Sequence, residues 1–383
     1  MNILIYGDSD TSPALRHEIP VAIGDPFLYL EADGRRAVLT NALEETRIAD
    51  AAPDVERLMM DALGRDELIA AGHSSLEIAQ ELCRRAAAAL SISEAVVPSE
   101  FPLGIADRLR DSGLTLTVDD EPFTERRRHK TATELAGIRR AADAAMRALE
   151  ESSRLLREAE IKGDELWTSG ERLTSEAVRA RIRRVCGDLG APVPADIMVK
   201  PMGPNPRIGH YPGLGPLPAH TPILIDLWPR DEESGCWADM TRTFVRGEIS
   251  DQIAQLHEIV MDAHERSCGA VRPGITGVQL YGIACDVIEA AGHPTQRTKQ
   301  AGEPLREGFY ASLGHGVGLR IHEGPPLGRT GTAPLIPGDV IAIEPGVVVR
   351  SIGGTRVEDL LIVTEDGAEN LTAGFPHSLR LDD

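Results

Sequence analysis

In the first third of the chain, short apolar runs alternate with helix-like segments, and this pattern predicts an α/β unit. The segment PFLYLEADGRRAVLTN, residues 26–41, contains two apolar runs around Asp33-Gly34. Aspartate followed by glycine is a common turn sequence, so two strands joined by a turn are expected here. A further strand is predicted in SGLTLTVDDEPF, residues 112–123.

Two helices are predicted between these strands. They cover DVERLMMDAL, residues 54–63, and SLEIAQELCRRAAAAL, residues 75–90. Ser74 or Ser75 is suited to cap the second helix, because a serine oxygen can accept a hydrogen bond from a free backbone N–H of the first turn.

A charged stretch without hydrophobic periodicity follows, TERRRHKTATE, residues 124–134. Such a stretch is the best candidate for a domain boundary. We place the boundary near residue 125, so that the chain has a domain 1–125 and a domain 126–383. A chain of 383 residues is long enough for two or three domains.

The second domain begins with a long segment of helical periodicity. Apolar residues recur at three- and four-residue steps over roughly 133–160, which predicts a long helix. A second helix is predicted over residues 169–190, closed by Gly190. Two more are expected over SDQIAQLHEIVMDAHERSCGAV, residues 250–271, and TGVQLYGIACDVIEAAG, residues 276–292.

Two strand pairs in this domain carry acidic residues in apolar surroundings. TPILIDLWPRDEESGCWADMTRTFV, residues 221–245, predicts two strands around a polar turn, so that Asp226 and Asp239 could face each other across a hairpin. Burying a carboxylate is costly unless another charge or hydrogen-bond donor compensates it. These two aspartates therefore need partners from elsewhere in the chain or from bound cations.

The second strand pair is GDVIAIEPGVVVRSIGGTRVEDLLIV, residues 338–363. Its turn is expected to include Gly353-Gly354 and to bring Glu344 and Glu358 together. Two such hairpins facing each other would collect four carboxylates.

Five residues interrupt apolar or glycine-rich strands and are candidate metal ligands: Asp226, Asp239, His315, Glu344 and Glu358. Any one of them alone would more often be a salt-bridged or capping residue. Together they supply a charge near −4, which two divalent cations would neutralise. Oxygen and imidazole ligands without thiolates suit manganese, cobalt, zinc or ferrous iron, and two metals about 3.5–4 Å apart are a common hydrolytic device.

Charge and hydropathy exclude several classes of protein. Forty basic and sixty acidic residues give a net charge of −20, which opposes binding to nucleic acid or to an anionic membrane. The first twenty residues have no basic region followed by a long apolar run, and no segment reaches the roughly 18 apolar residues of a membrane span. A soluble cytoplasmic protein is therefore expected.

The five cysteines are scattered and form no CxxC pair: Cys83, Cys186, Cys236, Cys268 and Cys285. This argues against a disulfide framework and a cysteine zinc site, so buried free thiols are expected. Cys236 lies close to Asp239 in sequence, but without a paired base we interpret it as packing. The glycines of GHGVG around His315 match no complete nucleotide-binding motif and are expected to form a tight turn.

Four segments in order, DMTRTF, GHGVGLRIHEGP, IEPG and GTRVEDL, closely resemble the pita-bread metallopeptidase family of methionine aminopeptidases, Xaa-Pro aminopeptidases and prolidases. The resemblance covers about 250 residues from Glu134 onward. The region before it is similar to the creatinase-type N-terminal domain of prolidases. The resemblance implies an α/β (α+β) protein, in which a smaller creatinase-like N-terminal domain precedes a pita-bread catalytic domain.

The resemblance also implies roles for individual residues. Asp226 would bind one metal, His315 and Glu344 the other, and Asp239 and Glu358 would bridge the two metals, with manganese the first expectation. A metal-bridging hydroxide would attack the scissile carbonyl while Glu344 handles the proton. The remaining implied residues are His210 and His322, which would bind the substrate carbonyl and oxyanion, and Arg356, which would orient the carboxylates.

The implied activity is that of a dinuclear exopeptidase that cleaves the N-terminal bond of short peptides, with Xaa-Pro substrates expected and a homodimer implied. Three departures bear on proline. Ala311 stands where prolidases usually carry a histidine, Trp228-Pro229 follows the first aspartate where the family commonly has glycine, and Asp226 and Asp239 are two residues farther apart than usual.

Other functions on the same fold remain open. They are a hydrolase with a substrate other than Xaa-Pro, a metal-free creatinase-like hydrolase, and a non-catalytic scaffold, and a side activity on phosphorus esters is also known for prolidase-like enzymes. The complete ligand set opposes the metal-free and non-catalytic alternatives.

Overall fold

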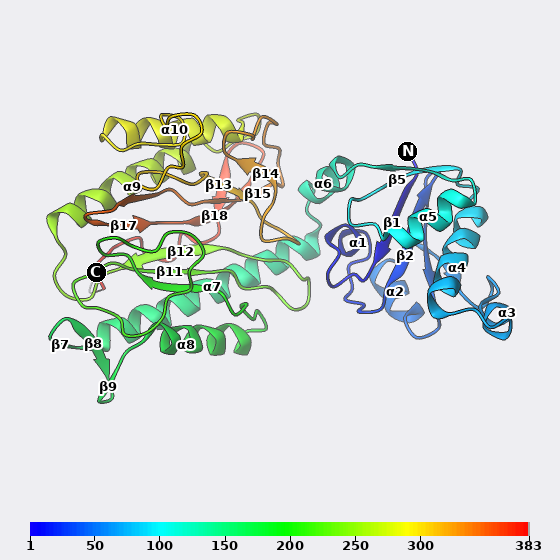
Figure 1. The fold of residues 1–383 in the computed structure, drawn as a ribbon, viewed down its shortest axis with the longest axis horizontal. Coiled ribbons are helices and arrows are strands. Elements are labelled where there is room, and N and C mark those ends of the chain that lie inside the picture. The colour runs from blue at the N-terminus through cyan, green and yellow to red at the C-terminus, as the bar shows by residue number, and fades with distance from the viewer. Residues whose placement is uncertain (382–383) are drawn as a thin grey trace. The chain divides into compact units, whose positions relative to one another are not determined.

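The computed structural model of the protein describes residues 1–381, which form two compact units. The first unit comprises Met1–Arg127 and the short segment Glu233–Gly235; the second comprises residues 128–232 and the chain from Cys236 onward. Figure 1 labels most of the elements of both. The division falls after Arg127, whereas the sequence placed it near residue 125. The creatinase-like assignment of the first unit stays a prediction.

A six-stranded mixed sheet lies at the centre of the first unit, with the strand order β4-β3-β2-β1-β5-β6. The strands are β1 Ile3–Gly7, β2 Phe27–Ala32, β3 Arg35–Thr40, β4 Glu56–Met59, β5 Glu94–Val97 and β6 Thr115–Val118. The helices are α1 Pro13–Glu18, α2 Glu45–Ala51, α3 Arg65–Ala70, α4 Ser75–Ala89, α5 Leu103–Asp111 and α6 Glu121–Arg128. Leu28 and Leu30 enter one apolar cluster while Phe27 and Tyr29 enter another, so the sheet is buried on both faces.

Most of the elements predicted for this unit are confirmed. β2 and β3 pair antiparallel around Asp33-Gly34, and β6 is the predicted further strand. Ser74 is the N-cap of α4. Its hydroxyl accepts a hydrogen bond from the backbone N–H of Glu77, and the Glu77 carboxylate accepts one from the backbone N–H of Ser74.

One predicted helix is wrong. Residues 54–63 contain the strand β4, which pairs parallel with β3 along the edge of the sheet. The apolar run there is short, and pairing with an existing strand outweighs the local preference. The charged stretch that begins at Thr124 also contains the end of helix α6, which the sequence did not predict.

The second unit packs helices on both sides of its strands. Its helices are α7 Ala132–Glu158, α8 Ser175–Asp188, α9 Asp251–Gly269 and α10 Gly277–Ala290. Its strands are β7 Glu160–Lys162, β8 Glu165–Thr168, β9 Glu171–Arg172, β10 Met198–Pro201, β11 Ile223–Leu227, β12 Met240–Phe244, β13 Gly314–Gly316, β14 Glu323–Leu327, β15 Val340–Ile343, β16 Gly346–Val349, β17 Gly353–Arg356, β18 Asp359–Val363 and β19 Ala368–Asn370. In Figure 1, α7 and α8 lie along one side of these strands and α9 and α10 along the other.

The four helices predicted for this region are confirmed, with one boundary corrected. The segment 169–190 forms α8 only from Ser175, after Thr174, whose hydroxyl accepts from the N–H of Ala177. The residues before this cap include β9 instead of helix. Gly190 follows the helix with φ +68°, a conformation that glycine adopts without steric cost. No helix among residues 1–381 is long and apolar enough to cross a membrane.

Both predicted strand pairs form, but the second is more elaborate than expected. β11 and β12 pair antiparallel, and β10 joins them in a three-stranded sheet. The second pair divides into two ladders: β15 pairs with β18, and β16 pairs with β17 in a separate sheet. Glu344 and Glu358 lie in the breaks between the ladders.

The predicted turn position in this second pair is wrong. Gly353 and Gly354 belong to β17, and the chain turns at residues 350–352. A close backbone approach explains the glycines. The N–H of Gly354 donates to the carbonyl oxygen of Met202 at 2.9 Å, and a Cβ on Gly353 would lie 2.2 Å from that oxygen.

Candidate metal centre

Asp226 and Asp239 come from the first hairpin. In the register of β11 and β12, Asp226 pairs with Thr241, two positions after Asp239. Because side chains alternate between faces along a strand, the two aspartates occupy the same face as diagonal neighbours, not directly opposite positions. One carboxylate oxygen from each still lies within 4.8 Å of the other and of one from Glu358.

Glu344 and Glu358 are held in place by backbone bonds to neighbouring segments. The N–H of Glu344 donates to the carbonyl of Leu313 at 2.8 Å, and the N–H of Glu358 donates to the carbonyl of Thr241 at 3.1 Å. The Thr241 hydroxyl also donates to Glu358 Oε2 at 2.7 Å. The two hairpins therefore meet, and the second hairpin brings its glutamates to the aspartates of the first.

His315 lies on β13, between β14 and β15, with its side chain only 12% exposed. Its Nε2 is 3.6 Å from Asp239 Oδ2 and 3.7 Å from Glu344 Oε1. Its Nδ1 lies 3.1 Å from the carbonyl oxygen of Gly316, which can accept a hydrogen bond from a protonated Nδ1 and so leave the lone pair on Nε2 free. Burial and the nearby His322 lower the pKa of His315 to about 4, so the imidazole is neutral at physiological pH.

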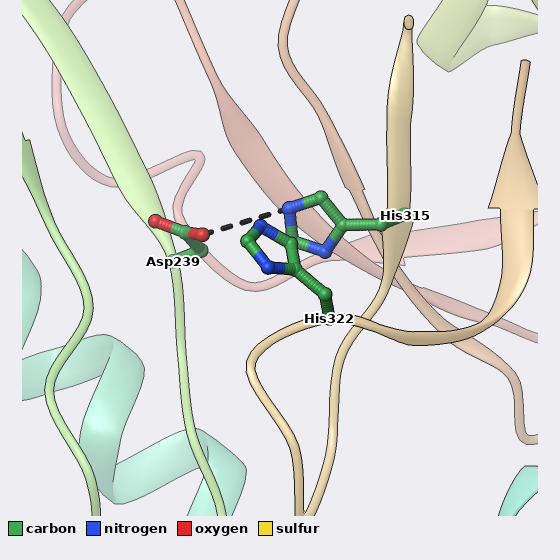
Figure 2. Close-up of side chains that lie close together, drawn as sticks. All are labelled: Asp239, His315 and His322. Atoms are coloured by element: carbon green, nitrogen blue, oxygen red, sulfur yellow. Dashed lines mark ion pairs between the residues drawn. The ribbon is translucent and has the colours of Figure 1, made fainter. Parts of the chain in front are cut away.

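His322 lies beside His315, as Figure 2 shows together with Asp239. The two imidazole rings meet edge to face, with centroids 4.2 Å apart. Burial lowers the pKa of His322, and the proximity of His210 adds to this. A neutral imidazole at this exposed position next to the carboxylates can donate or accept a hydrogen bond in the same space.

Three overlapping groups in this region have the composition of a metal site, each with its ligand atoms within 4.8 Å. They are Asp226, Asp239 and Glu358; His315, Glu344 and Glu358; and Asp239, His315 and His322. The five ligands predicted from the sequence are thus brought together. Their individual roles at a metal stay predictions.

The protein supplies too few partners for these carboxylates. Asp239 Oδ1 and Glu358 Oε1 are buried without a hydrogen-bond partner among the described residues. Burial, reinforced by the neighbouring carboxylates, raises the pKa of both Asp239 and Glu358, and burial raises that of Glu344 to about 7. Buried acids that repel each other and have unbonded oxygens fit bound divalent cations.

Among residues 1–381, Arg356 is the cation that forms ion pairs with this group. It pairs with Asp226 and, at 3.2 Å, with Glu344. Although burial opposes its charge, the carboxylates of Asp226 and Glu344 raise its pKa above the ordinary arginine value. A single guanidinium cannot neutralise four carboxylates, but it can fix the orientation of two of them.

A cavity of about 410 Å³ opens onto these residues. Other side chains on its wall include Trp228, Ala311, His210 and His322. His210 is exposed on the loop after β10, so this loop places a third imidazole at the cavity, besides His315 and His322. The bulky indole of Trp228 and the small Ala311 both face the space a substrate would occupy.

Lys200 and Tyr310 also line the cavity, and sequence reasoning missed both. Lys200 Nζ donates to the carbonyl of Gly209 at 2.6 Å, directly before His210. The Tyr310 hydroxyl contacts the backbone of the same glycine. Burial, followed by the charge of Arg356, lowers the pKa of Lys200 to about 8. A lysine in the buried strand β10 was the available signal, because lysine is almost never buried without a partner.

Comparisons with known proteins agree with this geometry. Residues 136–365 match the profile of metallopeptidase family M24. The chain is 38% identical over 135 residues to a Xaa-Pro dipeptidase of Pyrococcus furiosus, a match that spans 35% of each chain, about a third of that relative's length.

Solved structures extend the likeness to nearly the whole chain. A prolidase from Pyrococcus horikoshii has a TM-score of 0.74 at 22% identity, covering 99% of this chain and 95% of its own. A Xaa-Pro dipeptidase from Bacillus anthracis has a TM-score of 0.78 at 22% identity, covering 99% and 94%. This likeness confirms the predicted pita-bread fold. The family match spans more than half of the chain, and the protein therefore belongs to metallopeptidase family M24.

Proposed function

We propose that the protein is a metal-dependent exopeptidase that hydrolyses the N-terminal peptide bond of short peptides, with Xaa-Pro bonds as its substrates. The observation that carries this proposal is the set of three buried carboxylates, one partly buried carboxylate and one neutral imidazole around a single cavity. The names of the relatives, Xaa-Pro dipeptidase and prolidase, support the choice of bond.

The proposed cofactor is a pair of divalent metal ions, manganese in the first instance. Asp226 would hold one ion, His315 and Glu344 the other, and Asp239 and Glu358 would contact both. When bound, such ions polarise a carbonyl and make a water molecule a better nucleophile. The orphaned oxygens Asp239 Oδ1 and Glu358 Oε1 support this assignment.

The protein's own groups would move the proton and hold the substrate. A carboxyl whose pKa lies near 7, as burial sets for Glu344, can take a proton from water and return it to the leaving amine. His322 and His210 would hydrogen-bond the substrate carbonyl and the oxygen that becomes negative during attack. Lys200, through the carbonyl of Gly209, would keep the His210 loop in position.

A substrate other than Xaa-Pro is the second candidate. Two residues on the cavity wall favour it, Ala311 and Trp228. Ala311 replaces the histidine with which the family usually assists proline recognition, and the indole of Trp228 narrows the space beside Asp226. Comparable kcat/KM values on Xaa-Ala and Xaa-Pro peptides would favour this candidate.

Assembly and location complete the proposal. We propose a homodimer acting in the cytoplasm, with the N-terminal unit of one protomer next to the active site of its partner, as the family resemblance suggests. Sedimentation of the purified full chain tests the dimer, and a monomer that retains full activity would refute it.

The central experiment measures metal content and peptide hydrolysis together. Purified protein should hold about two divalent ions per chain, lose activity in strong chelator and recover it with Mn²⁺. Glu344→Gln and His322→Ala should abolish hydrolysis of Ala-Pro and Ala-Pro-Ala while the circular dichroism spectrum is unchanged. Full activity after verified metal removal would refute the proposal, and bound metal without hydrolysis of any peptide would indicate a scaffold.

A further inference from the structure

A second recess, of about 480 Å³, adjoins the candidate active site. Three arginines line it, Arg207, Arg306 and Arg350, together with Tyr211 and Val348. We call it the arginine recess. Three guanidinium groups around one recess are unexpected in a chain with a net charge of −20.

The arginine recess and the catalytic cavity share structural elements. Gly209 and His210 line the catalytic cavity, whereas Ile208 and Tyr211, on either side of them in the chain, line the recess. Val348 contributes to both. The loop that carries His210 therefore separates the two spaces, and a substrate extending past this loop would enter the recess.

The three guanidinium groups are available to a ligand. Within residues 1–381, the ion pairs and side-chain hydrogen bonds of the structure include none from the guanidinium of Arg207, Arg306 or Arg350 to a carboxylate. The nearby Glu307 carboxylate accepts instead from the backbone N–H of Arg350 at 3.3 Å. The Arg207 guanidinium lies over the Tyr211 ring, 4.7 Å from its centroid, which restricts its position without using its hydrogen-bond donors.

Backbone hydrogen bonds preform the walls of the recess. The N–H of Asn205 donates to the carbonyl oxygen of Arg350 at 2.6 Å and so ties the His210 loop to the turn after β16. Lys200 Nζ donates to the carbonyl of Arg207 at 3.4 Å as well as to that of Gly209. A ligand that enters here meets backbone segments already held near one another, which lowers the entropic cost of binding.

We propose that the arginine recess binds a carboxylate of the peptide substrate on the carboxyl side of the scissile bond, which rests on the proposed peptidase function. An N-terminal exopeptidase has one residue on the amino side of the bond, and the free amine of that residue is cationic and repelled by three arginines. The carboxyl side carries the negative C-terminus and any acidic side chain. An extended peptide advances roughly 3.3 Å per residue, so residues after the proline reach beyond the carboxylates, and the proposal places them in the neighbouring recess. The favoured substrates are thus acidic peptides longer than a dipeptide.

The test compares matched peptides within each variant of the full-length, metal-loaded protein. The peptides are Ala-Pro-Ala-Glu, its C-terminal amide, and Ala-Pro-Ala-Lys amide. For the wild type, kcat/KM should be about tenfold higher for the first peptide than for the third, chiefly through KM, and this ratio should fall as salt is added. Arg207→Gln and Arg350→Gln should each reduce the ratio toward one, and Arg350→Glu should invert it.

Arg272→Gln is the matched control, because Arg272 is an exposed arginine outside both spaces, and it should keep the wild-type ratio. Using a ratio within one variant removes general effects of substitution on folding or metal content. An unchanged preference in Arg207→Gln and Arg350→Gln, or a wild type that cleaves all three peptides equally, would overturn the proposal while the peptidase function stands.

Binding separates this proposal from the proposed function. Calorimetric titration of the acidic and basic peptides into the wild-type protein requires no cleavage. Tighter binding of the acidic peptide, lost in Arg350→Glu, would support the recess even if no Xaa-Pro bond is cleaved. Equal binding of the two peptides would refute the recess whatever the activity.

Discussion

Glu358 and Asp359 are adjacent in sequence and both are buried, yet the protein treats their carboxylates in opposite ways. Asp359 accepts hydrogen bonds from Arg242 at 2.8 Å, Asn370 at 2.7 Å and Thr372 at 2.9 Å, and His377 Nε2 lies 2.9 Å away. The carboxylate of Glu358 receives one hydroxyl, from Thr241, and its Oε1 has no partner among the described residues. Consecutive side chains near a strand point in opposite directions, so each meets a different environment.

The pKa values of the two groups diverge for the same reason. Burial alone would raise the pKa of Asp359, but the His377 hydrogen bond and the Arg242 charge lower it well below the ordinary value. Burial and the nearby Glu344 carboxylate raise the pKa of Glu358. His264, Asp359 and His377 have the spacing of a metal site, but the donors from Arg242, Asn370 and Thr372 already occupy both oxygens of Asp359. A buried carboxylate whose two oxygens both accept hydrogen bonds from the protein, as in Asp359, indicates a structural role. A buried carboxylate oxygen without a partner, as in Glu358, indicates a bound cation.

Removing Asp359 should have the largest effect on stability. Asp359→Ala leaves Arg242 buried and without its counter-charge, which should lower the free energy of unfolding by about 3–5 kcal/mol. Urea denaturation of the metal-free protein measures this. Glu365→Ala, at an exposed position nearby, should stay within about 0.5 kcal/mol of the wild type. If the two substitutions cost the same, the interpretation of Asp359 as a structural centre is wrong.

Neutralising Glu358 should have the opposite sign in the metal-free protein. Glu358→Gln removes a charge that repels Asp239 and Glu344, so metal-free stability should rise or stay equal, whereas metal affinity should fall by more than about 100-fold, beyond what loss of a supporting partner costs. Calorimetric Mn²⁺ titration and urea midpoints provide the two measurements. A stability loss comparable to that of Asp359→Ala would remove the distinction between these neighbours.

The raised pKa values also predict a pH dependence. In the folded metal-free protein, Glu344 keeps its proton up to about pH 7, whereas an unfolded glutamate loses its proton near pH 4.3. The free energy of unfolding should therefore be highest below pH 4.3. As pH rises from about 4.3 to 7, the free energy of unfolding should fall by about 3 kcal/mol relative to Glu344→Gln. Urea midpoints between pH 5 and 8 in chelator measure the difference. Equal slopes in the two proteins would contradict the raised pKa, and added Mn²⁺ should reverse the loss at pH 8.

Lys200 is expected to give the smallest of these effects, because it acts through the His210 loop. Lys200→Met removes the donor to the Gly209 carbonyl and should lower kcat/KM for Ala-Pro-Ala by about tenfold, while the metal content stays unchanged. Lys162→Met, at an exposed position in β7, is the matched control. Loss of metal from the Lys200 variant would place this lysine in the metal centre instead.

Local sequence patterns predicted most of the elements, and particular residues explain where they failed. The cap Ser74 and the periodicity of α7 are local signals, so these helices followed from neighbouring residues alone. The cap Thr174 is an equally local signal, but it was overlooked, and α8 was therefore started too early. β4 was misjudged because its strand character comes from pairing with β3. Gly353 was taken for a turn residue because its real constraint, the approach of the Met202 carbonyl, comes from a distant segment.

The candidate site divides in the same way. The kinds of ligand could be inferred from the sequence, because a charged residue within a buried strand is costly and therefore conspicuous. Three features of the site depend on contacts between segments far apart in the chain. They are the carboxylate oxygens that lack partners, the stagger of Asp226 and Asp239, and the support that Lys200 gives to the His210 loop. The arginine recess is of this second kind. Arg207, Arg306 and Arg350 resemble ordinary surface residues in the sequence, and only folding places three guanidinium groups around one recess beside the carboxylates.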